Sequence, residues 1–115
     1  MTTTDQISET MVSKLGTNKG VPRSRVWIEG KRLRAAGFHA KQTQYDKLFT
    51  HADVGNEPAL ILSAKPSGAL RVSGKGDHPI VDITGKQVAD HFAGFINVTV
   101  TYLPDEIVII GNDVA

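Results

Sequence analysis

The apolar positions of this chain recur mostly at every second residue, which is the spacing of half-buried β-strands. Val26 and Ile28 alternate with Trp27, and residues 96–103 alternate over a longer stretch. Further strands are expected over 42–49, 59–63, 69–73, 80–84 and 106–110. Glycine, proline and polar residues predict turns at 65–68 and 104–105, a loop over 51–58 and a connector over 74–77.

Two short segments change to helical spacing, each directly after a strand. They cover 31–36 and 86–93, and Gly37 and Gly94 are placed to end them, as glycine commonly does. The residues expected to face inward are Leu33, Ala36, Val88, His91 and Phe92. The expected fold class is therefore mostly β with short helices, an α+β fold.

The order β-α-β-β occurs twice along the chain. The first copy covers 25–64, the second covers 80–111, and a hairpin and linker over 65–79 join them. The matching positions are Val26 with Val81, Ile28 with Ile83, Gly30 with Gly85, Lys31 with Lys86, 36–38 with 93–95, Tyr45 with Tyr102, and 59–62 with 107–110. Glycine, aromatic and β-branched positions agree while surface residues differ, which is typical of a repeated unit. Chance similarity between two such passages is the alternative.

A chain of 115 residues is long enough for one hydrophobic core, and a single domain is expected over 23–115. Residues 1–22 are polar and without a sustained period, which predicts a flexible N-terminal arm with a short helix around 8–15. The first residues do not resemble a signal peptide, and no apolar run reaches the length of a membrane helix. We therefore expect a cytoplasmic protein that does not enter membranes.

The residue types disfavour several kinds of chemistry. The chain has no cysteine, which removes disulfides, cysteine nucleophiles and thiolate zinc sites. The spacing of the histidines does not match common metal sites: His39, His51, His78 and His91. The serines lack the sequence context of a nucleophile. We therefore expect no metal site, no cofactor and no enzymatic activity.

Charge is unevenly distributed, although the net charge is only +1. Residues 1–50 hold nine Lys and Arg against four acids, whereas residues 51–115 hold four against eight. Five cations lie close to Trp27 in the sequence: Arg23, Arg25, Lys31, Arg32 and Arg34. Such cations neutralise phosphates and an exposed indole stacks on bases, so these six residues are the candidate nucleic-acid site. The alternatives are a solvated face that balances the acidic half, and an indole that caps the core.

The first copy resembles the AbrB/SpoVT superfamily, and is most similar to its SymE-like branch. There a strand runs into the pattern G-x-x-L-x-x-A-G-F, which residues 30–38 match, and two more strands follow. The resemblance covers 25–64 and, more loosely, 80–111. It implies a swapped-hairpin β-barrel, formed here by two tandem β-α-β-β repeats within one chain. It also implies nucleic-acid binding through the basic residues of the first copy.

The second copy departs from that pattern. Asp82 and Asp90 stand where the first copy has Trp27 and Ala35. We therefore expect one nucleic-acid-binding face rather than a symmetric pair.

The expected function is a small nucleic-acid-binding protein, either a DNA-binding transcription regulator or a SymE-like protein related to toxin–antitoxin systems. Its partner would be DNA or RNA, and the chain would be a monomer or a homodimer. The alternative is a protein-binding inhibitor module from a phage or mobile element that acts on a host nucleoprotein. In that case acidic residues would imitate nucleic acid: Asp77, Asp82, Asp90, Asp105 and Glu106.

Overall fold

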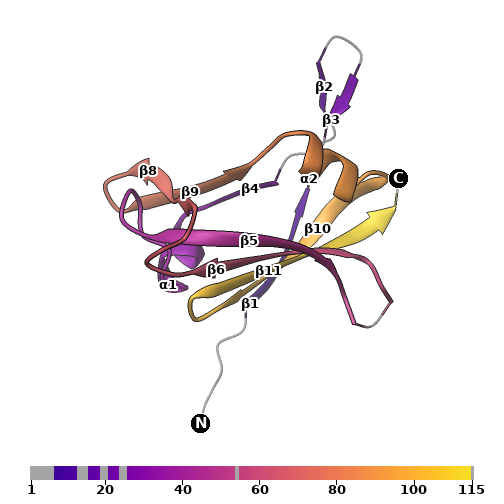
Figure 1. Cartoon of the computed structure of the whole chain (residues 1–115). Helices are drawn as coiled ribbons and strands as arrows, with labels where there is room; N and C mark the ends of the chain where they lie inside the picture. Colours follow the sequence, from indigo (N-terminus) through magenta and orange to yellow (C-terminus); the bar gives the residue numbers. More distant parts are fainter. Residues whose placement is uncertain (1–6, 13–15, 19–20, 24–25, 54, 115) are drawn as a thin grey trace.

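The computed structural model of the protein describes residues 7–12, 16–18, 21–23, 26–53 and 55–114, with side chains over 26–53, 55–95 and 98–112 (Figure 1). The strands are β1 (Ile7–Val12), β2 (Gly16–Asn18), β3 (Val21–Arg23), β4 (Val26–Glu29), β5 (Gln44–His51), β6 (Pro58–Ala64), β7 (Leu70–Arg71), β8 (Ser73–Lys75), β9 (His78–Ile83), β10 (Phe95–Leu103) and β11 (Glu106–Val114). The helices are α1 (Lys31–Ala35) and α2 (Lys86–His91).

These strands form antiparallel sheets. The largest has six strands in the order β1-β10-β11-β6-β5-β7. A second sheet has the order β4-β9-β8, and β2 pairs with β3 in a hairpin that projects from the other sheets in Figure 1. The expected α+β class, mostly β with short helices, is confirmed.

The described strands do not close into a barrel, so the expected swapped-hairpin barrel is not confirmed. Closure would give every strand a partner on both sides. Within the described residues, β1 and β7 each pair on one side of the six-stranded sheet. The chain leaves that sheet after β7, passes through buried Val72 and joins β9 as β8, so the strands are divided between separate sheets.

The β-α-β-β order occurs twice, as β4-α1-β5-β6 and as β9-α2-β10-β11. Matching strands of the two repeats pair with each other. In β4 and β9, Trp27 lies opposite Asp82, the position that matches it in the second repeat. In β6 and β11, residues 59–62 lie opposite residues 107–110 in reverse order. Exchanging the repeats leaves these pairs unchanged, so the two units are related by a local two-fold axis.

The core lies between the inner faces of the two larger sheets, with one helix from each repeat packed into it. Leu33 of α1 and Val88 of α2 occupy matching positions, and both are buried. Burying such a side chain stabilises the fold by roughly 1.5–3 kcal/mol. Tyr45 and Tyr102, which the sequence matches, are both buried as well.

The buried aromatic differs between the repeats. Phe38 is fully buried after α1, whereas its sequence match, Phe95, is only half-buried. In the second repeat the buried ring is Phe92, at the end of α2. The helix of the second repeat is one residue longer, and its buried ring stands two residues before Gly94, whereas Phe38 directly follows Gly37.

Three expectations for individual segments are corrected. The helix expected around 8–15 is not formed, because β1 occupies Ile7–Val12 and pairs along β10. The pairing of β1 satisfies backbone hydrogen-bonding groups along one edge of β10, which has nine residues. The strand expected over 69–73 is interrupted at Val72, and the connector expected over 74–77 contributes to β8 and its turn into β9.

Candidate nucleic-acid interface

One end of the molecule is built where the first repeat meets the β8–β9 hairpin. The backbone N–H of Gly30 donates to the carbonyl of Pro79 at 3.1 Å, which fixes the start of α1 beside β9. The N–H of Lys41 donates to the carbonyl of Val72 at 2.8 Å, and the N–H of Val72 donates to Thr43 at 2.9 Å. Residues 26–43 and 69–80 therefore form one contiguous surface, which we call the basic end.

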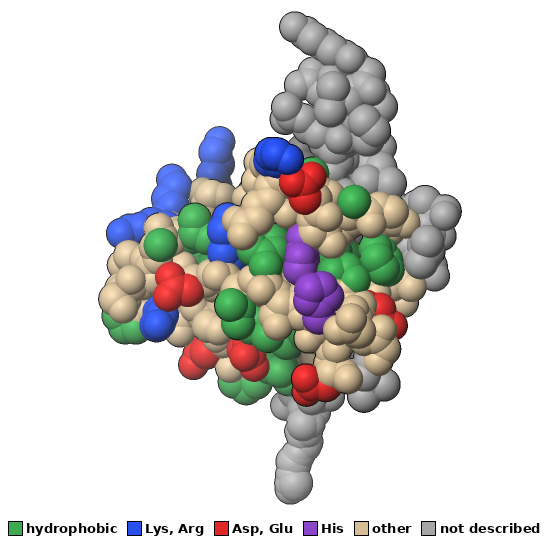
Figure 2. All heavy atoms as spheres, turned by 45° about the vertical axis from the view of Figure 1, so that its right-hand side comes forward, with side chains coloured by type: hydrophobic (Ala, Val, Ile, Leu, Met, Phe, Trp, Pro, Cys, Tyr) green, Lys and Arg blue, Asp and Glu red, His purple; other side chains and the backbone are tan. Residues whose placement is uncertain are grey.

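The basic end has an excess of positive charge. Its cations come from α1, the following loop, β7 and β8: Lys31, Arg32, Arg34, Lys41, Arg71 and Lys75. Its two carboxylates are Glu29 and Asp77, which leaves a net charge of +4 on a chain whose total is +1. Figure 2 shows Lys and Arg side chains gathered towards one end of the visible face. Such a concentration of cations attracts polyanions.

The structure places the predicted residues unevenly. Lys31 and Arg32 are exposed on α1. The guanidinium of Arg34 donates to the carbonyl of Asp77 at 3.3 Å and lies 3.8 Å from its carboxylate. Arg23 lies in β3 with its side chain outside the described residues, and Arg25 lies outside them altogether. Three of the five predicted cations therefore belong to the basic end.

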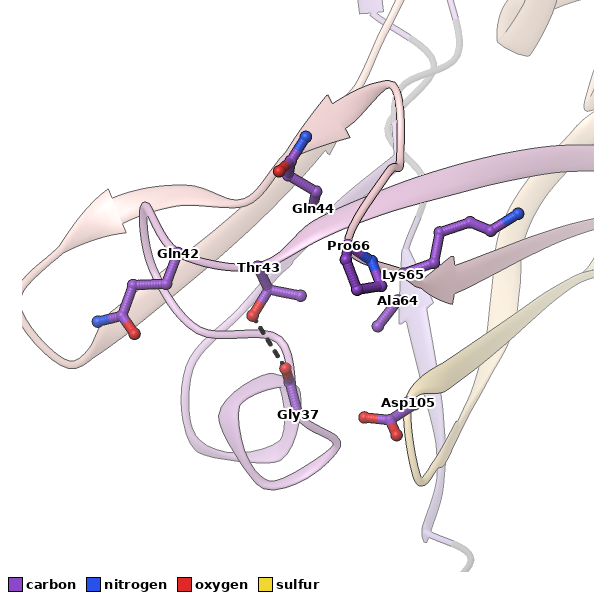
Figure 3. Close-up of a pocket in the computed structure, with 8 residues that line it drawn as sticks. All are labelled: Gly37, Gln42, Thr43, Gln44, Ala64, Lys65, Pro66 and Asp105. Carbon is purple, nitrogen blue, oxygen red and sulfur yellow. Dashed lines mark hydrogen bonds between the residues drawn. The ribbon is translucent and has the colours of Figure 1, made fainter.

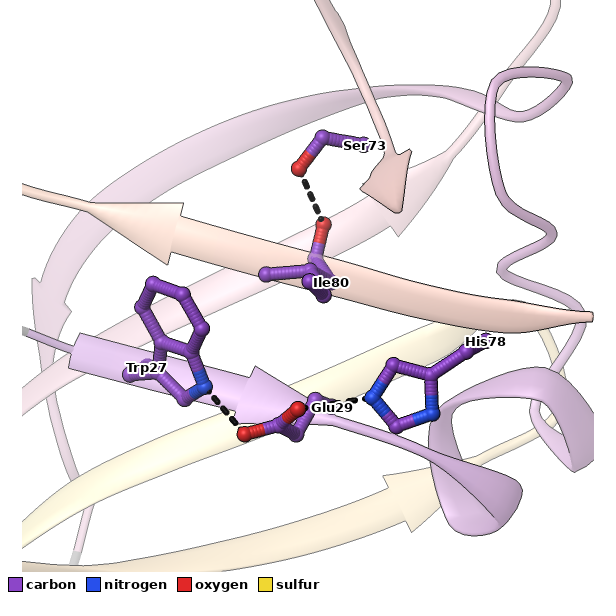
Figure 4. Close-up of polar contacts among 5 residues, drawn as sticks. All are labelled: Trp27, Glu29, Ser73, His78 and Ile80. Atoms are coloured by element: carbon purple, nitrogen blue, oxygen red, sulfur yellow. Dashed lines mark hydrogen bonds and ion pairs between the residues drawn. The ribbon is translucent and has the colours of Figure 1, made fainter. Parts of the chain in front are cut away.

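Trp27 lies on the outer face of β4, as the alternation with buried Val26 and Ile28 predicted. Its indole N–H donates to the carboxylate of Glu29, whose other oxygen is 2.7 Å from Nε2 of His78 (Figure 4). These two hydrogen bonds, with that of His78 the stronger influence, hold the pKa of the Glu29 carboxyl below its ordinary value. Trp27 and the β8–β9 hairpin are thus joined through one carboxylate.

Three cations of the basic end were missed by the sequence prediction: Lys41, Arg71 and Lys75. A guanidinium nitrogen of Arg71 donates to the carbonyl of Lys41 at 3.4 Å, which brings two of them together. Arg71 and Lys75 lie far from α1 in the sequence, and only strand pairing brings them beside it, whereas Lys41 lies in the loop that follows α1. The one local signal is that Lys75 stands in a glycine-rich connector, a common place for exposed cations.

The α2 end has different chemistry. Lys86 and Asp90 form an ion pair of 2.8 Å one helical turn apart, so their charges compensate each other. His51 and His91 lie with ring centres 5.4 Å apart, and the ring of Phe49 lies 5.0 Å from that of His91. Nε2 of His91 is 2.9 Å from the carbonyls of both Thr50 and Ala59, so this nitrogen carries the proton and donates. His91 therefore fastens α2 to the hairpin of the first repeat.

A shallow cavity of about 450 Å³ lies between the end of α1 and two turns (Figure 3). Its polar walls include Gln42, Gln44, Lys65 and Asp105. The amide of Gln44 donates to the carbonyl of Gly68 at 3.0 Å, and Lys65 pairs with Asp46 at 3.3 Å. These groups hold the surrounding turns, so the cavity is a weaker candidate for binding than the basic end.

The described residues contain no group of three or more His, Asp or Glu side chains placed to hold a metal ion. Among the same residues, no helix has the length and apolar character needed to span a bilayer. The fold and the surface together define a small α+β protein of two β-α-β-β repeats with one basic end. Comparison of the chain with protein-family models, curated proteins and solved structures finds no match.

Proposed function

We propose that this protein binds nucleic acid through its basic end. The observation that carries the proposal is the meeting of six cations from two separate segments, against two carboxylates. Both carboxylates already have partners, since that of Asp77 lies 3.8 Å from the guanidinium of Arg34 and that of Glu29 lies 2.7 Å from Nε2 of His78. The two carboxylates therefore do not neutralise the positive charge of the six cations, and bound phosphates would supply the missing negative charge.

The position of the cations suits a phosphate backbone. Lys31 and Arg32 are exposed on a short helix, while Arg71 and Lys75 are exposed on β7 and β8 of the same end. Rigid elements hold such side chains at fixed separations, so several phosphates along one strand are contacted together. Each neutralised phosphate releases counterions, and affinity then falls steeply with salt. Trp27 adds an aromatic group at the border of this surface.

The nucleic-acid proposal has more support than the protein-binding alternative. Mimicry of nucleic acid requires acids that form one negative surface. Here Asp90 is paired with Lys86 on α2, Asp77 is paired with Arg34 at the basic end, and Asp105 lies in the β10–β11 turn. These acids are therefore separated and partly neutralised.

The pairing of the repeats supports a finer proposal about the class of protein. The hairpin of each repeat packs against the helix end of the other, because Asp105 N–H donates to Ala36 and His91 donates to Thr50. This exchange of hairpins is what the resemblance to the AbrB/SpoVT superfamily implies. We therefore propose a regulator-like DNA-binding protein in which one chain supplies both halves.

The test is fluorescence anisotropy of labelled duplex DNA, single-stranded DNA and RNA over a salt series. The double variant Lys31→Ala/Lys75→Ala removes two exposed cations of the basic end. It should bind more weakly, and the slope of log K against log salt should fall by about 2 in magnitude.

The matched control is Lys65→Ala/Lys86→Ala, which removes the same charge from the β6–β7 turn and from α2. This control should keep the slope of the unaltered protein. Equal loss in both double variants would show a non-specific response to net charge. Absence of binding at low salt would refute the proposed function.

A further inference from the structure

A second cavity lies where the chain passes from the six-stranded sheet to the three-stranded sheet. It has a volume of about 270 Å³ and opens between β5 and β7 on one side and β8 and β9 on the other. This volume is at the lower limit of small-molecule pockets, which suits one flat ring rather than an extended ligand. The lining residues are Tyr45, Lys47, Leu70, Arg71, Ser73, Ile80, Asp82, Ile83 and Thr84.

The lining separates into three kinds of chemistry. Leu70, Ile80 and Ile83 provide apolar surface and are buried or half-buried. Exposed Lys47 and Arg71 supply positive charge from the β5–β7 side. Exposed Asp82 supplies a carboxylate from β9. The pocket thus has apolar walls, cations on one rim and a hydrogen-bond acceptor on the other.

The deepest polar group in the lining is the phenol of Tyr45, which is almost fully buried. Burial, with a smaller contribution from the charge of Asp82, raises the pKa of Tyr45 to about 12. The phenol is therefore neutral at physiological pH. An uncharged aromatic floor is compatible with a stacked or inserted base.

We propose that this pocket binds one unpaired nucleobase that carries an exocyclic amine. The carboxylate of Asp82 would accept a hydrogen bond from that amine, and Lys47 and Arg71 would contact the adjoining phosphates. The proposal rests on the proposed function and adds to it a preference for single strands and for base type. Arg71 belongs both to the basic end and to the pocket rim. A strand bound along the basic end therefore reaches the pocket without leaving positively charged surface.

The carboxylate gives the base preference its chemical reason. An ionised carboxylate accepts hydrogen bonds only, and it offers about four acceptor positions. It can therefore accept from the amino group of cytosine and keep its contacts within the protein. Thymine presents a carbonyl at the same position, and two acceptors repel each other. A base paired in a duplex cannot enter, because its edge is occupied and its ring is stacked.

The test compares oligo(dC), oligo(dT) and a random duplex of equal length at one salt concentration. The chain has a single tryptophan, and Trp27 lies directly opposite Asp82 in the β4–β9 ladder. Its fluorescence therefore reports occupation of the pocket without a label. We expect about tenfold tighter binding of oligo(dC) than of oligo(dT), the ratio expected for one hydrogen bond to a charged group.

Asp82→Asn is the decisive variant. An amide both donates and accepts, so it no longer distinguishes cytosine from thymine, and the tenfold ratio should fall to near one. The substitution also removes a negative charge. That charge effect by itself strengthens binding of oligo(dC) and oligo(dT) equally, so it does not change the ratio between them. Asp90→Asn makes the same charge change on α2 and should retain the tenfold ratio.

The possible results separate the pocket from the proposed function. Equal binding of oligo(dC) and oligo(dT), or a ratio that persists in Asp82→Asn, would overturn the pocket proposal while leaving the basic end in place. Preference for the duplex over both single strands would overturn it as well. Failure of all three probes to bind would refute the proposed function itself.

Discussion

The two repeats place matching helices at different ends of the protein (Figure 1), and those ends differ in electrostatic character. In α1, Leu33 is buried, Lys31 is exposed, and the helix contains no acidic residue. In α2, Val88 is buried in the same way, but the exposed Lys86 is paired with Asp90. The two helices therefore share their buried apolar position but differ in their exposed charges.

This difference teaches which residues the fold requires. Positions that pack between the sheets must be apolar in both repeats, since an unpaired buried charge is strongly destabilising. Exposed positions contribute little to stability and are free to differ. An excess of charge that is present in one repeat and compensated in the other is therefore better explained by binding than by folding.

The largest difference is expected between two phenylalanines at matching positions. Phe38 is fully buried and contacts the ring of Tyr45 edge-on at 5.8 Å, whereas Phe95 is half-buried. Phe38→Ala should lower the free energy of unfolding by about 3–5 kcal/mol. Phe95→Ala should cost roughly half as much or less, because less apolar area is lost. Urea unfolding monitored by circular dichroism measures both, and equal losses would contradict the assignment of Phe38 to the core.

A smaller difference is expected between the glycines that end the helices. Gly37 and Gly94 have φ angles of 101° and 88°, so alanine at either costs about 1–2 kcal/mol. At Gly37 a Cβ atom would also lie 2.5 Å from Oδ1 of Asp105, whereas Gly94 has open space. Gly37→Ala should therefore cost about 1 kcal/mol more than Gly94→Ala.

Asp105→Gly provides the control for that difference. It removes the carboxylate at a residue whose φ is 59°, a conformation that glycine adopts readily. In this background the two alanine substitutions should have similar effects on thermal unfolding. If Gly37→Ala still destabilises the protein more than Gly94→Ala in this background, the contact with Asp105 is not the cause of the difference.

The link between Trp27 and the β8–β9 hairpin predicts a pH dependence at the basic end. The pKa of Glu29 is held below its ordinary value of 4.5 by hydrogen bonds from His78 and Trp27. A lowered carboxyl pKa contributes stability above pH 4.5, and that stability is lost as pH falls through the lowered value. Trp27 fluorescence between pH 6 and pH 3 should report the loss, and Glu29→Gln should remove this transition. An unchanged transition in Glu29→Gln would refute the link.

The smallest effect is expected at the exposed ion pair of α2. Asp90 raises the pKa of Lys86, but both side chains are largely in solvent, where such pairs contribute little. Lys86→Ala should leave the urea midpoint unchanged within error. A clear loss of stability would show that the charges of α2 are structural, which would weaken the contrast with α1.

Much of the fold could be predicted because local sequence patterns determine where its strands and helices lie. Alternation located β4 and β10, short apolar runs located β6 and β11, and the glycines at 37 and 94 end their helices with positive φ as expected. The pairing of β1 with β10 could not be predicted, because the polar residues of 7–12 show no period that favours a strand. Its partner lies about ninety residues away, and local sequence does not specify such a contact.

The candidate site was predicted only in part for the same reason. Lys31, Arg32 and Arg34 form a run that is visible in the sequence. Arg71 and Lys75 join them only because β8 pairs with β9 and β9 lies beside the start of α1. The sequence prediction also treated Asp82 as a departure from the basic pattern, whereas the structure places it on the rim of a pocket.

The most direct test of the central claim is an NMR titration of the ¹⁵N-labelled protein with a short oligonucleotide. The account predicts that amide shifts cluster over residues 30–43 and 70–78, at the basic end, and that they diminish as salt is raised. The amide resonances of residues 86–95, at the α2 end, should not shift. Shifts confined to 86–95, or spread equally over both ends, would contradict the claim that one repeat of this protein binds nucleic acid.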